Sequence, residues 1–172
     1  MLNLIKNQLS KIFLLTGGFM KKSGFTIIEL MIVVAIIAFL ATVSVPKYFK
    51  YHAKAKQAEV AMNLASLHTA QQAYFAENGT YSKVLNGPDG IGWQPQGNNF
   101  YYTYGFNFPG AKEGIHYFVG KLGAKKESLG QTQADKTGFI VSAAGDVIGK
   151  QKIDLWQIDQ DRNLKNVQKG IE

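Results

Sequence analysis

The residues with the most unusual chemistry for their position lie between Lys21 and Glu29. The sequence KKSG (residues 21–24) runs directly into a long apolar stretch, in which Glu29 is the only charged residue. If the chain were cut after Gly24, Phe25 would gain a free, positively charged amine. Burying that amine among apolar helices requires an anion, and Glu29 lies about one helical turn away. The spacing therefore allows an ion pair, either within one chain or between neighbouring chains.

The apolar stretch itself has the length of a membrane span. Residues 25–45 read FTIIELMIVVAIIAFLATVSV, and as an α-helix they would measure about 31 Å, which matches the hydrocarbon core of a bilayer. The stretch is apolar on all sides, so it is not an amphipathic surface helix. Lys21 and Lys22 before it predict a cytoplasmic N-terminus and an exported remainder. A secretory signal peptide has its small residues after the apolar region, whereas Gly24 precedes it.

The sequence KKSG followed by FTIIEL resembles the class III signal of type IV prepilins and of the related pseudopilins of type II secretion. The resemblance implies that a membrane prepilin peptidase cuts between Gly24 and Phe25 and methylates the new amine of Phe25. It also implies that Glu29 helps to set the register of an incoming subunit against its neighbour's N-terminus. Gly24, Phe25 and Glu29 are therefore the predicted processing and assembly residues.

Residues 1–24 are predicted to be the leader peptide, which is long for this family. The five residues from Met20 to Gly24 alone would be a sufficient leader. Two glycines, Gly17 and Gly18, stand just upstream of Met20, and their codons are compatible with a purine-rich ribosome-binding sequence. These two observations lead to the hypothesis that translation starts at Met20.

The remaining chain predicts an α+β fold, in which a long N-terminal helix packs on a three- or four-stranded antiparallel sheet. Residues 25–46 are the expected hydrophobic transmembrane and polymerisation part of the helix, and residues 47–78 its amphipathic part. Pro46 removes one backbone hydrogen bond and predicts a kink at this point. The alternative is that Pro46 ends the span, but residues 47–76 contain no further Gly or Pro and favour continuation.

One face of the amphipathic part is expected to pack on the head, which comprises residues 79–172. The residues on that face are Val60, Leu64, Leu67 and Tyr74.

Three or four strands are expected in the head. Gly79 is able to adopt the positive φ that ends a helix, and residues 83–99 are rich in Gly, Asn and Pro and predict a loop. Alternation predicts a strand over 100–108, and shorter strands are expected at 115–120, 139–143 and 154–158, with Gly145 and Asp146 in the turn between the last two. The chain has no cysteine, so strand pairing and Trp156 are expected to hold the C-terminal region.

The sequence offers little for catalysis. It contains no P-loop, dinucleotide fingerprint or nucleophile elbow, and His52, His68 and His116 lack the spacing of metal ligands. The chain is therefore predicted to be no enzyme and to bind no cofactor. Four aspartates near the C-terminus raise the question of calcium, but they lack EF-hand spacing, so a solvated acidic edge is favoured and no metal site is predicted. These are Asp146, Asp154, Asp159 and Asp161.

The net charge of +7 is unevenly placed. Four lysines and no acid precede Gly24, whereas the rest of the chain carries 15 basic and 12 acidic residues, a net charge of +3. A basic N-terminal segment is typical of the cytoplasmic flank of a membrane span, and a general nucleic-acid binder is disfavoured. DNA is thus a weakly supported partner.

Together with the resemblance, these features predict the structural subunit of a type IV pilus, which serves surface attachment, twitching motility or DNA uptake. The implied partners are further copies of the chain in a helical homopolymer, the prepilin peptidase, the pilus assembly platform and the outer-membrane secretin. Precursor and mature monomer are expected in the inner membrane, and the assembled fibre outside the cell. The alternative is a type II secretion pseudopilin that forms a periplasmic piston. A membrane-anchored sensor or binding domain would require Gly24 and Glu29 to be coincidental.

Overall fold

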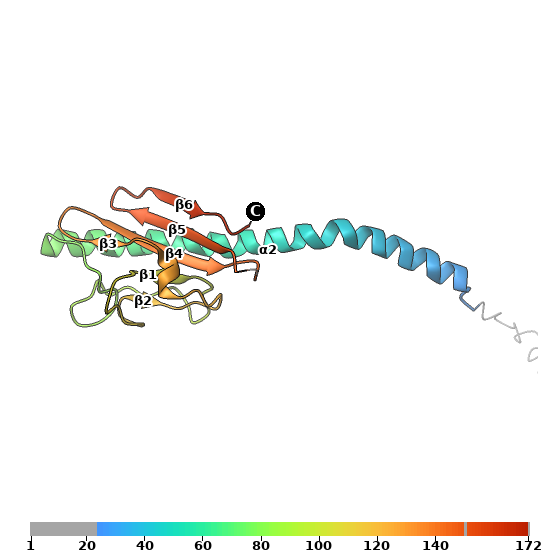
Figure 1. Ribbon diagram of the computed structural model, residues 1–172, viewed down its shortest axis with the longest axis horizontal. Helices are drawn as coiled ribbons and strands as arrows, with labels where there is room; N and C mark the ends of the chain where they lie inside the picture. Colours follow the sequence, from blue (N-terminus) through green and yellow to red (C-terminus); the bar gives the residue numbers. More distant parts are fainter. Residues whose placement is uncertain (1–23, 150, 172) are drawn as a thin grey trace, which may run out of the picture. The chain divides into compact units, whose positions relative to one another are not determined.

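The computed structural model describes residues 24–149 and 151–171, which form one long helix followed by an antiparallel sheet (Figure 1). The elements are helix α2 (Ile27–Asn78), strands β1 (Thr103–Gly105), β2 (Tyr117–Phe118), β3 (Gln133–Ala134), β4 (Phe139–Asp146), β5 (Ile153–Asp159) and β6 (Leu164–Gln168), and the short 3₁₀ helix η1 (Lys126–Leu129). The predicted α+β class is confirmed. The predicted leader up to residue 23, including the hypothetical start at Met20, lies outside the described residues.

The sheet is larger than predicted. Its strands pair antiparallel in the order β2-β1-β4-β5-β6, and β3 also pairs with β4, which gives six strands in the described part of the chain instead of three or four. Strand β2 was predicted, but it occupies only two residues of the expected range 115–120. Strand β3 was not predicted, because its two residues are too few to show a period in sequence. Strand β6 reads LKNVQ and is largely exposed at the sheet edge, so its sequence lacks the apolar pattern that would predict a strand.

Two strand boundaries were predicted wrongly. The alternating aromatic run from 100 to 108 forms only the three-residue strand β1, and residues 102–106 are all buried. Strand β4 continues through Gly145 and Asp146, so the turn to β5 follows these residues. The alternation fails because the sheet is covered on both sides. Helix α2 packs on one side, and the segment containing η1 packs on the other, where the Thr103 hydroxyl donates to the Ala124 carbonyl at 2.6 Å.

Strand β1 depends on a glycine. Gly105 has a φ of 136°, and a Cβ at this position would lie 2.4 Å from the carbonyl oxygen of His116. A side chain at this position would therefore both strain the backbone and push β1 away from β2.

The first part of α2 has no contact with a core. The chain divides between Val43 and Ser44 into two compact units, and in the first unit every described residue, from Gly24 onward, is exposed. Among the described residues, α2 is the one helix long and apolar enough to cross a membrane. The helix does not end at Pro46 but continues to Asn78, so continuation is the correct alternative. Gly79 follows with a φ of 64° and donates its N–H to the Phe75 carbonyl, which closes the helix as predicted.

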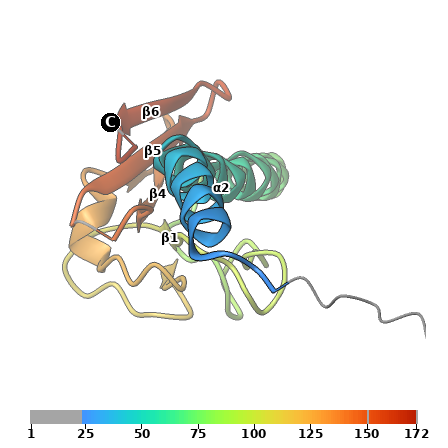
Figure 2. The same ribbon diagram turned by 90° about the vertical axis from the view of Figure 1, so that its right-hand side faces the viewer.

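In the second unit, one face of α2 forms the core of the head together with β1, β4 and β5 (Figure 2). Val60, Leu64 and Leu67 are fully buried, as predicted, and burial of each such side chain contributes roughly 1.5–3 kcal/mol. Tyr74 is only partly buried, and Gln71 is the buried residue at this end of the face. Polar burial is tolerated because Gln71 exchanges two hydrogen bonds with the backbone of Ser82.

Candidate functional site

The first turn of α2 is closed by a reciprocal pair of hydrogen bonds between Thr26 and Glu29. The backbone N–H and the hydroxyl of Thr26 donate to Glu29 Oε2 at 2.8 and 2.7 Å, and the N–H of Glu29 donates to Thr26 Oγ1 at 3.3 Å. Thr26 precedes the first helical residue and Glu29 is the third, so the pair is a capping box. The sequence carries the signal for this box, a threonine three residues before a glutamate, but the role of Thr26 was not predicted.

The capping box holds the Glu29 carboxylate at the N-terminal end of the helix, beside Thr26 and thus one residue from Phe25. The positive end of the helix macrodipole also favours a carboxylate there. All three hydrogen bonds of the box use either Oε2 or the Glu29 backbone, and within the described part of the chain no donor lies on Oε1. This oxygen is thus available to a further cation. Phe25 is 81% exposed, so the amine that the predicted cleavage would create is accessible to the same chain or to another copy.

The fold gives no reason for a glycine at position 24. A Cβ at Gly24 would meet no heavy atom within 4 Å, and its φ lies outside the left-handed region. Ten other glycines of the described chain have positive φ, and the remaining ones stand within 3.1 Å of a neighbour that a Cβ would meet. Gly24 is therefore the one described glycine that neither its backbone conformation nor its packing requires.

A second polar cluster surrounds Asp154, which is fully buried in the head. Its Oδ2 accepts hydrogen bonds from Tyr102 Oη at 2.7 Å, Trp156 Nε1 at 2.7 Å and Gln57 Nε2 at 2.9 Å. Its Oδ1 accepts from Gly170 N–H at 3.0 Å and Asn166 Nδ2 at 3.1 Å. This carboxylate of β5 thus joins α2, the residue before β1, β6 and the C-terminal residues. Trp156 and strand pairing do hold the C-terminal region, as expected, but Asp154 is the centre of the arrangement.

The Asp154 carboxylate is kept ionised by these donors. Burial by itself raises the pKa of Asp154, but the hydrogen bonds from Gly170, Tyr102, Gln57 and Trp156 outweigh this effect and lower the pKa below its usual value. Conversely, burial and the adjacent carboxylate raise the pKa of the Tyr102 hydroxyl. The cluster is therefore a structural anion site satisfied from within the chain.

The other aspartates of the predicted acidic edge serve separate turns. Asp146 accepts the N–H groups of Gly149 and Gln151, and Asp159 accepts those of Asp161 and Asn163. Among the described residues, no group of three His, Asp or Glu side chains is placed to hold a metal ion.

The three histidines also lie in separate environments. His52 is exposed, the ring of His68 lies against the Gln160 carbonyl at 3.0 Å, and His116 Nδ1 accepts the Lys112 N–H.

Comparison with known proteins addresses the N-terminal segment. Residues 19–45 match the family model described as the prokaryotic N-terminal methylation motif. The chain carries a methylation motif. This motif contains Gly24, Phe25, Thr26 and Glu29, which are the residues of the capping box and of the predicted cleavage position.

Proteins similar to part of the chain include three pilus proteins. The chain is 46% identical over 81 residues to the type IV major pilin protein PilA of Myxococcus xanthus, covering 47% of this chain and 36% of that protein. It is 44% identical over 71 residues to the type IV pilus subunit protein TapA of Aeromonas hydrophila, covering 41% and 50%. Identity to the type IV major pilin protein PilE1 of Neisseria gonorrhoeae is 37% over 70 residues, covering 41% and 32%. The chain thus spans a third to a half of the length of the curated relatives it matches.

Proposed function

We propose that the chain is the structural subunit of a type IV pilus, made as a precursor that a prepilin peptidase cleaves between Gly24 and Phe25. The methylation motif and the similarity to pilins support this proposal. The observation that carries it is the position of Glu29, in the first turn of a helix whose residues up to Tyr51 are all exposed. Such an apolar surface is unfavourable in water, so the isolated helix requires either lipid or further copies around it.

In this function the same apolar surface of the helix has two successive surroundings. In the inner membrane, the run up to Val45 contacts lipid, and in the fibre it contacts the equivalent run of neighbouring copies. Both surroundings remove it from water, so transfer between them costs little hydrophobic free energy. What distinguishes the fibre is the pair between Glu29 of one copy and the methylated amine of Phe25 of a neighbour. An ion pair in an apolar surrounding is strongly position-dependent and so sets the register.

The assembly platform and the outer-membrane secretin follow from this function as partners. Surface attachment and twitching motility are the corresponding activities of the fibre. DNA uptake has less support, because residues 57–172 carry 11 basic and 11 acidic residues and thus no net charge.

The experiment that tests the proposal compares Gly24→Leu with Gly24→Ala in cells. Intact mass spectrometry of the membrane fraction reports cleavage, and mass spectrometry of sheared surface fibres reports assembly. We expect the wild-type chain in the fibres with Phe25 as its methylated first residue. Gly24→Leu should accumulate as uncut precursor without fibres, and Gly24→Ala should be processed at least in part.

Normal processing of Gly24→Leu would contradict the proposed cleavage. A wild-type chain that is cleaved but stays in the periplasm, absent from the sheared material, would instead identify a pseudopilin.

A further inference from the structure

The net positive charge of the chain beyond Gly24 comes from a segment of ten residues. Residues 47–56 read KYFKYHAKAK and contain four lysines and no acid. Because the residues from Gln57 onward carry no net charge and Glu29 contributes −1, the net charge of +3 after Gly24 comes entirely from this segment. We call residues 47–56 the basic segment.

Most charges of the basic segment face solvent. Lys47, Lys50 and Lys54 are exposed, and no hydrogen bond or ion pair joins them to the described residues. Lys56 is half-buried, with its ammonium 5.3 Å from the centre of the Tyr101 ring.

Aromatic side chains alternate with these lysines and face solvent too. Tyr48 and Phe49 are 63% exposed and Tyr51 is 70% exposed. Aromatic and basic side chains together are typical of a protein surface at the boundary between bilayer and water.

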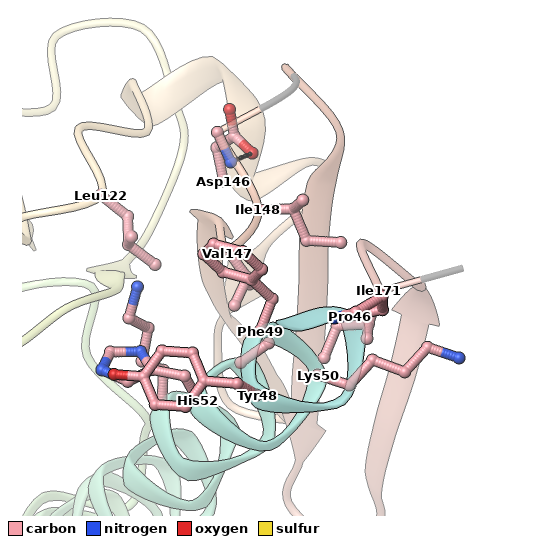
Figure 3. A pocket seen from close by; sticks show the side chains of 13 residues that line it. Pro46, Tyr48, Phe49, Lys50, His52, Leu122, Asp146, Val147, Ile148 and Ile171 are labelled. Carbon is pink, nitrogen blue, oxygen red and sulfur yellow. Dashed lines mark hydrogen bonds between the residues drawn. The ribbon is translucent and has the colours of Figure 1, made fainter. Parts of the chain in front are cut away.

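Beside the basic segment lies a groove with a volume of about 630 Å³. In Figure 3, Pro46 and Phe49 of α2 face Val147 and Ile148 of the β4–β5 connection, and Ile171 lies at one end. The Lys50 ammonium extends outward at the rim. A groove of this size is within the range of sites for small apolar ligands, roughly 300–1,000 Å³.

The place of the basic segment in the chain indicates its surroundings. Lys47 comes two residues after Val45, where the apolar run of membrane-spanning length ends. A helix that leaves a bilayer at this point puts the next turns among the lipid headgroups. The predicted orientation rests on the lysines before the run and puts residues 47–56 on the exported side, so the lysines of the basic segment do not serve orientation.

We infer that the basic segment and the adjoining groove bind anionic phospholipid while the subunit is in the membrane. The lysines hold the headgroup phosphate, and the groove takes the upper part of an acyl chain. Each lysine near an anionic surface gives about a five-fold preference. DNA would use the lysines but has no use for an apolar groove. A second copy would offer these lysines no surplus of negative charge, because its residues 57–172 carry no net charge. The inference rests on the membrane stage of the proposed function and not on the fibre.

The test uses the absence of cysteine in the chain. Ile148→Cys in the full chain gives one thiol in the groove wall for a fluorophore. Ile115→Cys is the matched control, since Ile148 and Ile115 are 40% and 37% exposed. The backbone N–H groups of Leu85 and Asn86 donate hydrogen bonds to the Ile115 carbonyl, so this control lies in another part of the head.

Each labelled chain is reconstituted in vesicles of equal parts phosphatidylcholine and phosphatidylglycerol. A nitroxide near the headgroup of either lipid reports by quenching which lipid lies beside the label. We expect phosphatidylglycerol to quench the label at 148 several-fold more than phosphatidylcholine, and the label at 115 to be quenched weakly by both. Replacing Lys47, Lys50 and Lys54 by Gln should bring the preference at 148 close to one. Replacing the exposed lysines Lys112, Lys121 and Lys125 by Gln should leave it unchanged.

Equal quenching by the two lipids in the wild-type chain would overturn the inference, as would a preference that survives the first triple substitution. Binding of a labelled DNA duplex that displaces phosphatidylglycerol from the label at 148 would assign the lysines to nucleic acid. Disulfide-linked dimers of Ile148→Cys without lipid quenching would assign the groove to a second copy. Fibre counts in cells are independent of these results, so failure of the lipid site and failure of the pilus function are distinguishable.

Discussion

The hydroxyl of Thr26 lies 2.7 Å from Oε2 of Glu29, so the carboxylate predicted to meet an incoming amine already caps its own helix. The cap fixes the carboxylate at the end of α2 before any partner arrives, which reduces the entropy lost on pairing. Capping and charge are separable, because glutamine also serves as the third residue of a capping box. Substitutions at the two positions therefore distinguish the roles.

Glu29→Gln should abolish fibres while leaving cleavage unchanged. The amide keeps the hydrogen bonds of the cap but offers no charge to the amine of Phe25, which would then be buried unpaired with every added copy. Electron microscopy would count the fibres, and intact mass of the membrane fraction would confirm mature monomer. Glu29→Asp keeps the charge with a shorter reach and should retain a fraction of the fibres. Wild-type fibre numbers in Glu29→Gln would mean that charge pairing is not the mechanism.

Thr26→Val should weaken the cap without abolishing assembly. The substitution removes the hydroxyl, retains the backbone donor to Glu29, and should cost the first turn of α2 about 1 kcal/mol. Amide hydrogen exchange of the chain in detergent should be faster at Ile28 and Glu29 and unchanged beyond Tyr48, with fibre numbers near normal. Loss of fibres equal to that of Glu29→Gln would show that the cap, rather than the charge, is what assembly requires.

Asp154→Asn should destabilise the head by about 3 kcal/mol, because an amide nitrogen cannot accept hydrogen bonds from the buried donors around it. Tyr102→Phe removes one of the five donors and should cost about 1 kcal/mol. Thermal or denaturant unfolding of the head measures both values. Asp161→Asn, in an exposed turn, is the control and should have little effect.

The effect of Asp154 should also depend on pH. Its pKa is lowered in the folded state, so the stability it contributes is fully present above the unfolded pKa of about 3.9 and is lost as pH falls through the lower folded value. The difference in unfolding free energy between wild type and Asp154→Asn should therefore be constant from pH 7 to about 5 and shrink below about pH 4. A difference that grows with acidity would contradict an ionised Asp154.

Gly105→Ala should disrupt β1. The added methyl would meet the His116 carbonyl and the Tyr117 backbone, and the φ of 136° is strained for alanine. We expect a loss of at least about 2 kcal/mol in the unfolding free energy of the head. Gly110→Ala is a useful control, because its φ is also positive but nothing lies within 4 Å of the added carbon. Equal effects of the two substitutions would show that backbone strain, and not the close approach, sets the requirement for glycine.

A fragment that begins at His52 should fold without the apolar run. It retains Ala53, the first buried residue of α2, and with it the face that covers the sheet. The fragment should be soluble and monomeric, and should unfold cooperatively as judged by circular dichroism. Aggregation with loss of the strand signal would show that the head depends on the first unit.

The sequence alone determined the features that arise from composition and short-range spacing. The apolar run from Phe25, the position of Gly24 and Glu29, and the buried face of α2 at Val60, Leu64 and Leu67 were readable, since helical periodicity and membrane length are local properties. The closing of the helix at Gly79 was predictable for the same reason.

Tertiary structure decided what depends on residues far apart in the chain. The unpredicted strands β3 and β6 exist because a neighbouring strand pairs with them. Strand β1 is shorter than its alternating pattern predicted because η1 covers the second side of the sheet. Asp154 was placed on a solvated edge from its sequence neighbours. It is instead buried, and five donors converge on it: Gln57 of α2, Tyr102 just before β1, Trp156 of β5, Asn166 of β6 and Gly170. The donors that compensate a buried charge are visible only after the chain has folded.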